Sequence, residues 1–323
     1  MKYRPLGATG IMVSEIGFGA WGIGGVTADA TSYGVTDDAR SRAALARSFD
    51  LGITLYDTAP AYGDGHSEEL IGDVFRGRRD RVIIATKAGQ ERWGQPPDFS
   101  PPALRRSVEA SLRRLGGDAI DLLQLHNPPA DLFATNPAVS AMLDSLRRAG
   151  KIRAWGVSVK SPQEALTLMR SAPVAVVQAN LNMLDVRAVT TGLLAETAAR
   201  GVGMIARTPL CFGFLSGAVD ETTRFAPDDH RSAWSRAQIA CWADGARRLH
   251  DAAVSVPDLP RSRTALRFCL SFPEVATTIP GILSAEEAEQ NAATSTAGPL
   301  DAEAIGRVLD LHSRESFFLR PGT

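Results

Sequence analysis

The sequence predicts a single (β/α)₈ TIM barrel, with a β-hairpin at the amino terminus and extra helices near the carboxyl terminus. Short β-branched apolar runs alternate with amphipathic helical patterns from residue 16 to residue 294. Near-continuous apolar strands between helices are typical of a parallel sheet that is covered on its outer face. Eight such units within about 250 residues fit a barrel better than an open sheet.

The predicted strands are the apolar runs that precede each helical pattern. They cover residues 15–19, 54–57, 82–86, 120–125, 154–158, 175–178, 203–206 and 276–279. Three helix starts follow from capping residues. Ser100 precedes a proline pair and a helical pattern that runs to residue 115, and Ser161 precedes a proline, with Glu164 completing a capping box. Ser284 begins a helix whose acidic first turn suits the positive end of the helix dipole.

Three segments fall outside this alternation. Residues 2–13 predict a hairpin that plugs the amino-terminal mouth of the barrel. Residues 211–259 predict a long loop and a helix over about 232–250, and a loop of this length on the carboxyl face is usually functional. Residues 301–314 predict a final helix packed outside. With no linker or repeat in the chain, residues 1–323 are expected to form one domain.

Composition narrows the possible partners and the compartment. The formal charge of −1 gives no reason to expect nucleic acid or an anionic membrane as partner. Four arginines in the helix after Ser100 resemble a basic cluster, but helix spacing places them on its solvated flanks: Arg105, Arg106, Arg113 and Arg114. The 3 cysteines are too few for a disulfide framework, and no apolar run approaches the ~18 residues of a membrane span. We expect a cytoplasmic protein.

Reactive side chains lie at the carboxyl ends of three successive predicted strands. The segment YDTAPAYG (56–63) supplies Asp57 and Tyr62, VIIATK ends on Lys87, and DLLQLH ends on His126. Taken singly, each has an ordinary structural explanation, such as a loop tyrosine or a hydrogen-bonded histidine. Together they are more informative, because the carboxyl ends of barrel strands form the functional face.

These four groups suit proton transfer. A tyrosine with its usual pKa of about 10 exchanges protons poorly at neutral pH. A nearby ammonium at Lys87 would lower that pKa, and Asp57 would keep Lys87 charged and oriented. His126 could hydrogen-bond a carbonyl oxygen or share the proton with Tyr62. The set fits reversible proton transfer to an alkoxide, the step that accompanies hydride transfer.

Other chemistries fit less well. The 5 histidines contain no HxH or HxxxH pair, and only His126 closes a strand, so no metal site is predicted. No GxSxG nucleophile motif is present, and Cys211 has no base beside it in the sequence.

Several segments, in this order along the chain, resemble those of a known family. They are GFGAWGIGG (17–25), YDTAPAYGDGHSEELIG (56–72), VIIATK (82–87), SLRRLGGDAIDLLQLHNP (111–128), KIRAWGVSV (151–159), VVQANLN (176–182), TPLCFGFLSG (208–217) and TIPGILSAEEAEQN (278–291). With these segments the chain resembles the aldo-keto reductase superfamily over nearly its full length. It is most similar to the bacterial branch that carries IPG near its end.

The resemblance implies a barrel that holds an extended nicotinamide cofactor without a Rossmann domain. It places the catalytic tetrad at Asp57, Tyr62, Lys87 and His126, with Tyr62 as proton donor or acceptor. It places cofactor contacts at Ala20, Trp21, Asp57, Ser158, Gln178, Arg207, Thr208, Pro209, Leu210, Gly213, Leu215, Gly217, Gly281, Ser284, Glu287, Gln290 and Asn291. Ser158 and Gln178 match the positions that bind the carboxamide of the nicotinamide.

The chain departs from the family pattern at several of these places. Val159 replaces a common asparagine, and Arg207 stands where many relatives stack an aromatic ring on the nicotinamide. Its guanidinium could lie flat against the ring or could bind an anionic substrate. Leu283 and Glu287 occupy places where NADPH-preferring members carry cationic or neutral polar groups, so they favour NAD or the use of both cofactors. Family usage slightly favours NADP, and the choice stays open.

The leading hypothesis is an NAD(P)-dependent oxidoreductase that interconverts an aldehyde or ketone and the corresponding alcohol. One alternative is a cofactor-bound redox sensor or regulatory subunit built on the same barrel. Another is an NAD-dependent sugar dehydrogenase, which Glu287 keeps open. The partner is expected to be a small carbonyl or alcohol substrate. The sequence does not fix its identity, the reaction direction or the oligomeric state.

Overall fold

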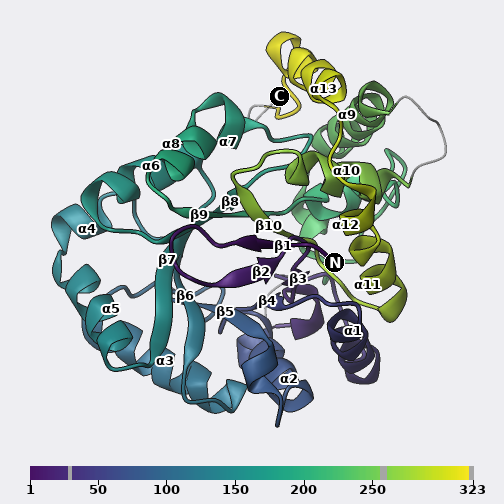
Figure 1. The fold of residues 1–323 in the computed structure, drawn as a ribbon. Helices are drawn as coiled ribbons and strands as arrows, with labels where there is room; N and C mark the ends of the chain where they lie inside the picture. The colour runs from purple at the N-terminus through teal and green to yellow at the C-terminus, as the bar shows by residue number, and fades with distance from the viewer. Residues whose placement is uncertain (28–30, 255–259, 320–323) are drawn as a thin grey trace.

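The structure, a computed structural model, describes residues 1–27, 31–254 and 260–319 (Figure 1). Eight parallel strands form one sheet in the order β10-β9-β8-β7-β6-β5-β4-β3. Their bounds are β3 (Phe18–Gly19), β4 (Leu55–Asp57), β5 (Ile83–Ala88), β6 (Ile120–His126), β7 (Ile152–Ser158), β8 (Val176–Asn180), β9 (Gly203–Arg207) and β10 (Val275–Ile279). Bridges from Ile16 to Thr278 and from Gly19 to Gly281 join the outer strands. The predicted (β/α)₈ barrel is confirmed.

Helices surround the barrel, as Figure 1 shows. Those between strands and after β10 are α1 (Asp38–Asp50), α2 (His66–Val74), α3 (Pro101–Leu115), α4 (Leu132–Thr135), α5 (Ala138–Arg148), α6 (Pro162–Ser171), α7 (Arg187–Thr190), α8 (Leu193–Ala199), α9 (Arg236–Ala253), α10 (Arg261–Leu270) and α11 (Ala285–Ala292). The extra helices are α12 (Thr294–Ala297) and α13 (Ala302–Arg314). The helix predicted after Ser100 has the expected ends, because Gly116 terminates it in the left-handed conformation.

The amino-terminal hairpin packs against the barrel interior. Its strands β1 (Tyr3–Pro5) and β2 (Met12–Ser14) pair antiparallel, and Figure 1 shows them lying across one end of the barrel. Leu6, Ile11 and Val13 are buried in one cluster with inward-facing residues of the barrel strands. Leu6 packs so closely against Gly203 that a Cβ there would lie 2.8 Å from a Leu6 methyl carbon.

The barrel interior has an apolar layer beneath a polar one. The apolar layer includes Leu55, Ala85, Leu122, Val176 and Ile205. Two residues further along the same strands stand Asp57, Lys87, Gln124, Gln178 and Arg207. Because side chains alternate across a strand with a period of two, these polar residues face the same interior at its carboxyl end.

The long segment after β9 differs in detail from the sequence prediction. It contains two 3₁₀ helices, η4 (Cys211–Ser216) and η5 (His230–Ala233), before α9. The helix expected over 232–250 begins at Arg236, because Ser235 Oγ accepts from the backbone N–H of Gln238 and caps the first turn. Trp234 therefore precedes the helix, although its ring still lies 5.0 Å from that of Trp242. Residues 255–259 of the predicted segment lie outside the described residues.

Candidate active site

Asp57 lies at the centre of a buried hydrogen-bond network. Lys87 Nζ donates to its Oδ1 at 2.6 Å, and the side-chain amides of Gln124 and Gln178 donate to Oδ2 at 3.0 and 2.7 Å. The side chains of Lys87 and Asp57 are 0% and 3% exposed. A buried carboxylate needs such partners, and here three other strands, β5, β6 and β8, supply them.

Lys87 is held as a cation. Burial opposes its charge, but the Asp57 carboxylate and hydrogen bonding with Asp57 and Tyr62 outweigh burial and raise the pKa of Lys87. The ammonium also donates to the carbonyl oxygen of Thr58 at 2.8 Å. Its position is therefore fixed from two directions.

Tyr62 is presented by a tight turn between β4 and α2. Gly63, Asp64 and Gly65, which follow it, have φ values of 63°, 54° and 101°. A Cβ on Gly63 would lie 1.9 Å from the carbonyl oxygen of Gly24, so glycine is required there. The turn leaves Tyr62 half-buried, with its ring centroid 4.8 Å from Lys87 Nζ.

His126, at the end of β6, completes the predicted tetrad beside Tyr62. Its ring is perpendicular to that of Tyr62, with centroids 6.0 Å apart. Burial lowers the pKa of His126 well below its ordinary value, and the charges of Lys87 and Arg207 lower it further. The imidazole is therefore neutral, and its buried Nδ1 has no partner among the described residues. The structure thus brings all four predicted residues together.

Ser158, Gln178 and Arg207 extend this network across the next strands. Arg207 Nη1 donates to Ser158 Oγ at 3.1 Å, and Ser158 Oγ donates to Gln178 Oε1 at 2.9 Å. Since Gln178 also donates to Asp57, a continuous chain of hydrogen bonds joins Arg207 to Lys87. The three predicted cofactor contacts therefore adjoin the tetrad.

The loop after β9 contains a cluster of unusual backbone conformations. Thr208, Cys211 and Phe212 have positive φ values of 57°, 43° and 56°, and Gly213 follows at 98°. Residues other than glycine tolerate this region poorly, and such outliers cluster at ligand sites. Gly213 is one of the predicted cofactor contacts, and its positive φ suits a glycine.

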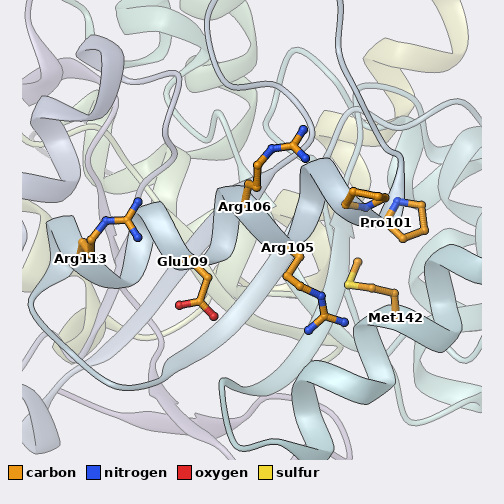
Figure 2. A pocket seen from close by; sticks show the side chains of 7 residues that line it. Pro101, Arg105, Arg106, Glu109, Arg113 and Met142 are labelled. Carbon is orange, nitrogen blue, oxygen red and sulfur yellow. The ribbon is translucent and has the colours of Figure 1, made fainter.

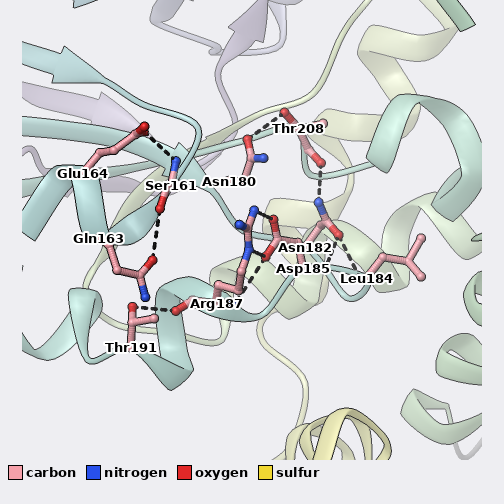
Figure 3. A network of polar contacts seen from close by, with 10 residues as sticks. All are labelled: Ser161, Gln163, Glu164, Asn180, Asn182, Leu184, Asp185, Arg187, Thr191 and Thr208. Carbon is pink, nitrogen blue, oxygen red and sulfur yellow. Dashed lines mark hydrogen bonds and ion pairs between the residues drawn. The ribbon is translucent and has the colours of Figure 1, made fainter. Parts of the chain in front are cut away.

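A polar network anchors this loop to the ends of β8 and β9 (Figure 3). Asn182 Nδ2 donates to the carbonyl oxygen of Thr208 at 3.0 Å. The Asn182 Oδ1 accepts from the backbone N–H groups of Leu184 and Asp185. The Asp185 carboxylate is itself paired with Arg187 at 2.6 Å. These contacts hold the strained backbone in place.

Aromatic rings line the site next to Tyr62. The Trp21 ring lies 6.4 Å from that of Tyr62, and the rings of Tyr33 and His230 lie 5.0 and 4.7 Å from Trp21. His230 belongs to the long segment after β9 and bonds to the carbonyl oxygen of Ser32 through both its backbone N–H (2.9 Å) and its Nδ1 (3.0 Å). Two distant loops therefore meet beside Tyr62.

Another group of predicted cofactor contacts lies after β10 and on α11. Ser284 Oγ caps this helix by accepting from the backbone N–H of Glu287 at 3.2 Å. Glu287 Oε2 accepts from the backbone N–H of Leu283 at 2.7 Å. Gln290 is exposed and Asn291 is buried, and no hydrogen bond among the described residues links either to the tetrad. This end of the predicted site is separate from the catalytic network.

Sequence reasoning missed Gln124, Trp93 and His230. Gln124 could have been found, because it stands two residues before His126 and so shares its face of β6. Trp93, whose ring lies 5.2 Å from that of His126, follows β5 in a loop without a pattern. His230 is more than a hundred residues from any tetrad member in the sequence, and no local signal links it to Trp21.

A hollow outside the barrel has no connection with this chemistry. It is lined mainly by α3 residues, among them Arg105, Arg106 and Arg113, and by Met142 of α5 (Figure 2). These three arginines are exposed, as expected. The expectation for Arg114 is wrong, because its Nε pairs with the fully buried carboxylate of Glu68 at 2.6 Å. Glu68 lies on α2, so the pair ties two helices together.

The donor set suits a nicotinamide dinucleotide. Gln178 and Ser158 offer donors and acceptors for a planar amide, and the unpartnered Nδ1 of His126 and Oε1 of Gln124 are polar atoms left over at the same site. Gly281 has open space where a Cβ would stand. Among the described residues, no cluster of three or more His, Cys, Asp or Glu could hold a metal ion. Each helix in the described part of the chain is too short or too polar to cross a bilayer.

Comparisons with known proteins agree with this geometry. The profile of the Aldo/keto reductase family matches residues 15–312. Aldo-keto reductase YhdN of Bacillus subtilis (strain 168) is 37% identical over 237 residues, which are 72% of this chain and 69% of that protein. The holo form of aldo-keto reductase AKR11C1 from Bacillus halodurans has a TM-score of 0.77 at 27% identity, covering 100% of this chain and 99% of that one. The glycerol dehydrogenase AKR11B4 from Gluconobacter oxydans has a TM-score of 0.78 at 28% identity, covering 99% and 98%.

The chain therefore belongs to the aldo/keto reductase family, whose members are oxidoreductases acting on small-molecule carbonyl compounds. This assignment and the barrel together support carbonyl–alcohol redox catalysis.

Proposed function

We propose that this protein is an NAD(P)-dependent oxidoreductase that interconverts an aldehyde or ketone and its alcohol. In the reductive direction, a bound reduced nicotinamide would supply a hydride to the carbonyl carbon and would itself be oxidised. Tyr62 gives its phenolic proton to the carbonyl oxygen, so a C–H and an O–H bond form on the substrate as a nicotinamide C–H bond and the Tyr62 O–H bond break. The observation that carries the proposal is the position of Lys87, whose Nζ lies 2.6 Å from Asp57 Oδ1 and 4.8 Å from the Tyr62 ring centroid.

Each member of the tetrad has a distinct part in this proposal. The Lys87 cation stabilises the negative charge that remains on Tyr62 after proton transfer, and Asp57 keeps Lys87 in place. His126 is neutral, so it can hydrogen-bond the carbonyl oxygen without taking the proton from Tyr62. Gln124 is a positioning residue that acts through Asp57.

Ser158 and Gln178 are proposed to hold the carboxamide of the cofactor. Glu287 is proposed to face the adenosine ribose, with one oxygen already fixed by Leu283. A carboxylate at this place would repel a 2′-phosphate, which arginine or lysine normally binds. Family usage still slightly favours NADP, so the proposal includes both dinucleotides.

Two measurements on the intact chain test this function. Isothermal titration calorimetry with NADPH and with NADH should give saturable binding of at least one of them. Adding small aldehydes and ketones to the loaded enzyme should then remove the absorbance of the reduced nicotinamide. Binding without turnover of any carbonyl compound would instead favour the sensor or regulatory subunit. Failure to bind either dinucleotide would refute the proposal.

A further inference from the structure

Arg207 is a half-buried cation at the end of β9. Its Nη1 donates to the neutral hydroxyl of Ser158 at 3.1 Å, and no carboxylate among the described residues pairs with it. Arginines elsewhere on this rim differ. Arg231 pairs with Asp229 and Arg187 pairs with Asp185, each at 2.6 Å. A partly buried guanidinium normally has such a partner.

Within the described part of the chain, no carboxylate lies within ion-pair distance of Arg207. Both oxygens of Asp57 already accept hydrogen bonds, from Lys87, Gln124 and Gln178. Lys160, just beyond β7, is exposed and also lacks an acidic partner among the described residues. The charges of Arg207 and Lys160 both reach His126, which they help to keep neutral. The ends of β6 to β9 therefore carry an excess of positive charge.

The nicotinamide must lie close to this charge if the proposed function is right. The hydride has to reach the carbon whose oxygen contacts Tyr62 and His126. Trp21 stands beside Tyr62 on one side, with its ring 6.4 Å away. On the other side, Ser158 and Gln178 form the pair of side chains suited to a planar amide. Arg207 bonds directly to that pair.

From this arrangement we propose that Arg207 makes the site selective for the reduced cofactor, so that the protein works as a carbonyl reductase. This inference rests on the proposed function. Hydride transfer to the carbonyl carbon, with a proton from Tyr62 to its oxygen, would turn the neutral ring of the reduced cofactor into a cation. The unpaired charge of Arg207 would disfavour that cationic form, so the oxidised cofactor would bind more weakly than the reduced one.

The size of this effect follows from like-charge repulsion. An opposite charge within about 4–6 Å favours a charged group by a factor of about ten to a thousand, and a like charge acts in the opposite sense. Solvent screening at a half-exposed side chain reduces the effect. We therefore expect Arg207 to raise the ratio of the Kd of the oxidised cofactor to that of the reduced cofactor about tenfold.

Calorimetric titration of four proteins with NADPH, NADP⁺, NADH and NAD⁺ tests the inference. The proteins are the wild type, Arg207→Gln, Arg207→Lys and Lys160→Gln. Glutamine can keep a hydrogen bond to Ser158 but loses the charge, whereas lysine keeps the charge. The oxidised-to-reduced Kd ratio should fall about tenfold in Arg207→Gln and stay near the wild-type value in Arg207→Lys. Lys160→Gln, at an exposed site, should change it by less than about twofold.

The outcomes separate the two proposals. If the reduced cofactor binds but Arg207→Gln keeps the wild-type ratio, the inference about Arg207 is wrong and the proposed function stands. A wild-type ratio below one would also overturn it. If none of the four dinucleotides binds the wild type, both proposals fail. If Arg207→Gln does not fold, the Kd ratios of the wild type and of Arg207→Lys decide. A wild-type oxidised-to-reduced Kd ratio near ten that changes by about twofold or less in Arg207→Lys supports the inference. A wild-type ratio near one overturns it.

Discussion

Lys87 and Asp57 form an ion pair that is almost fully shielded from solvent, with side chains 0% and 3% exposed. Removing one member leaves the other charge buried without a partner, which destabilises a protein by about 3–5 kcal/mol. We predict that Lys87→Met lowers the free energy of unfolding by about this amount in urea denaturation. The double variant Asp57→Asn/Lys87→Met removes both charges and should recover part of the loss. A Lys87→Met protein as stable as the wild type would show that Lys87 and Asp57 do not form a buried ion pair.

His126 gives the protein a defined response to pH. Burial holds its pKa well below the ordinary value, so the folded protein keeps this imidazole neutral. In the unfolded chain histidine takes up a proton below about pH 6.5, so stability falls as the pH drops below that value, by up to about 1.4 kcal/mol per pH unit. Between pH 7 and pH 5, His126→Gln should lose less stability than the wild type. His230, His250 and His312, whose pKa values are also lowered, contribute equally to both proteins. If the free energy of unfolding depends on pH equally in the two proteins, the fold does not lower the pKa of His126.

The turn between β4 and α2 is the element that places Tyr62. Its Gly63 combines a φ of 63° with a direct approach to the Gly24 carbonyl, whereas Gly77 has a φ of 78° and open space around it. Gly63→Ala meets both a conformational and a steric penalty, but Gly77→Ala meets only the first, of about 1–2 kcal/mol. We predict that Gly63→Ala loses most turnover and more than about 2 kcal/mol of stability. Gly77→Ala should keep its turnover. Similar turnover in the two variants would mean that the turn does not control Tyr62.

At the scale of the whole molecule, the residues that stabilise the barrel and those of the proposed active site lie at opposite ends of its axis. The hairpin packs Leu6, which is fully buried, into the amino-terminal end, and the polar layer lies at the other end. Leu6→Ala should lower the free energy of unfolding by about 2–5 kcal/mol because it leaves a cavity. Cofactor affinity, measured by calorimetry, should stay unchanged. The exposed Met12 is the control, and Met12→Ala should change stability by less than about 0.5 kcal/mol. A loss of affinity in Leu6→Ala would show that the two ends are coupled.

How much of this could be predicted depends on the range of the interactions. The eight strands and the tetrad follow local rules, since apolar runs mark strands and Asp57, Lys87 and His126 close them. The pairing of Arg114 with Glu68 and the contact of His230 with Trp21 depend on how distant segments pack, so no local pattern encodes them. The helix expected over about 232–250 begins instead at Arg236, because the Ser235 side chain caps its first turn.

The most direct test of the central claim is the rate of hydride transfer in Tyr62→Phe, measured in a single turnover after the reduced cofactor is bound. Phenylalanine keeps the ring beside Lys87 and removes only the proton that Tyr62 is proposed to supply. We predict that the rate falls by about a hundredfold or more, while the Kd of the reduced cofactor stays within about twofold of the wild type. A Tyr62→Phe protein that transfers hydride at the wild-type rate would contradict the role of Tyr62, and with it the proposed mechanism.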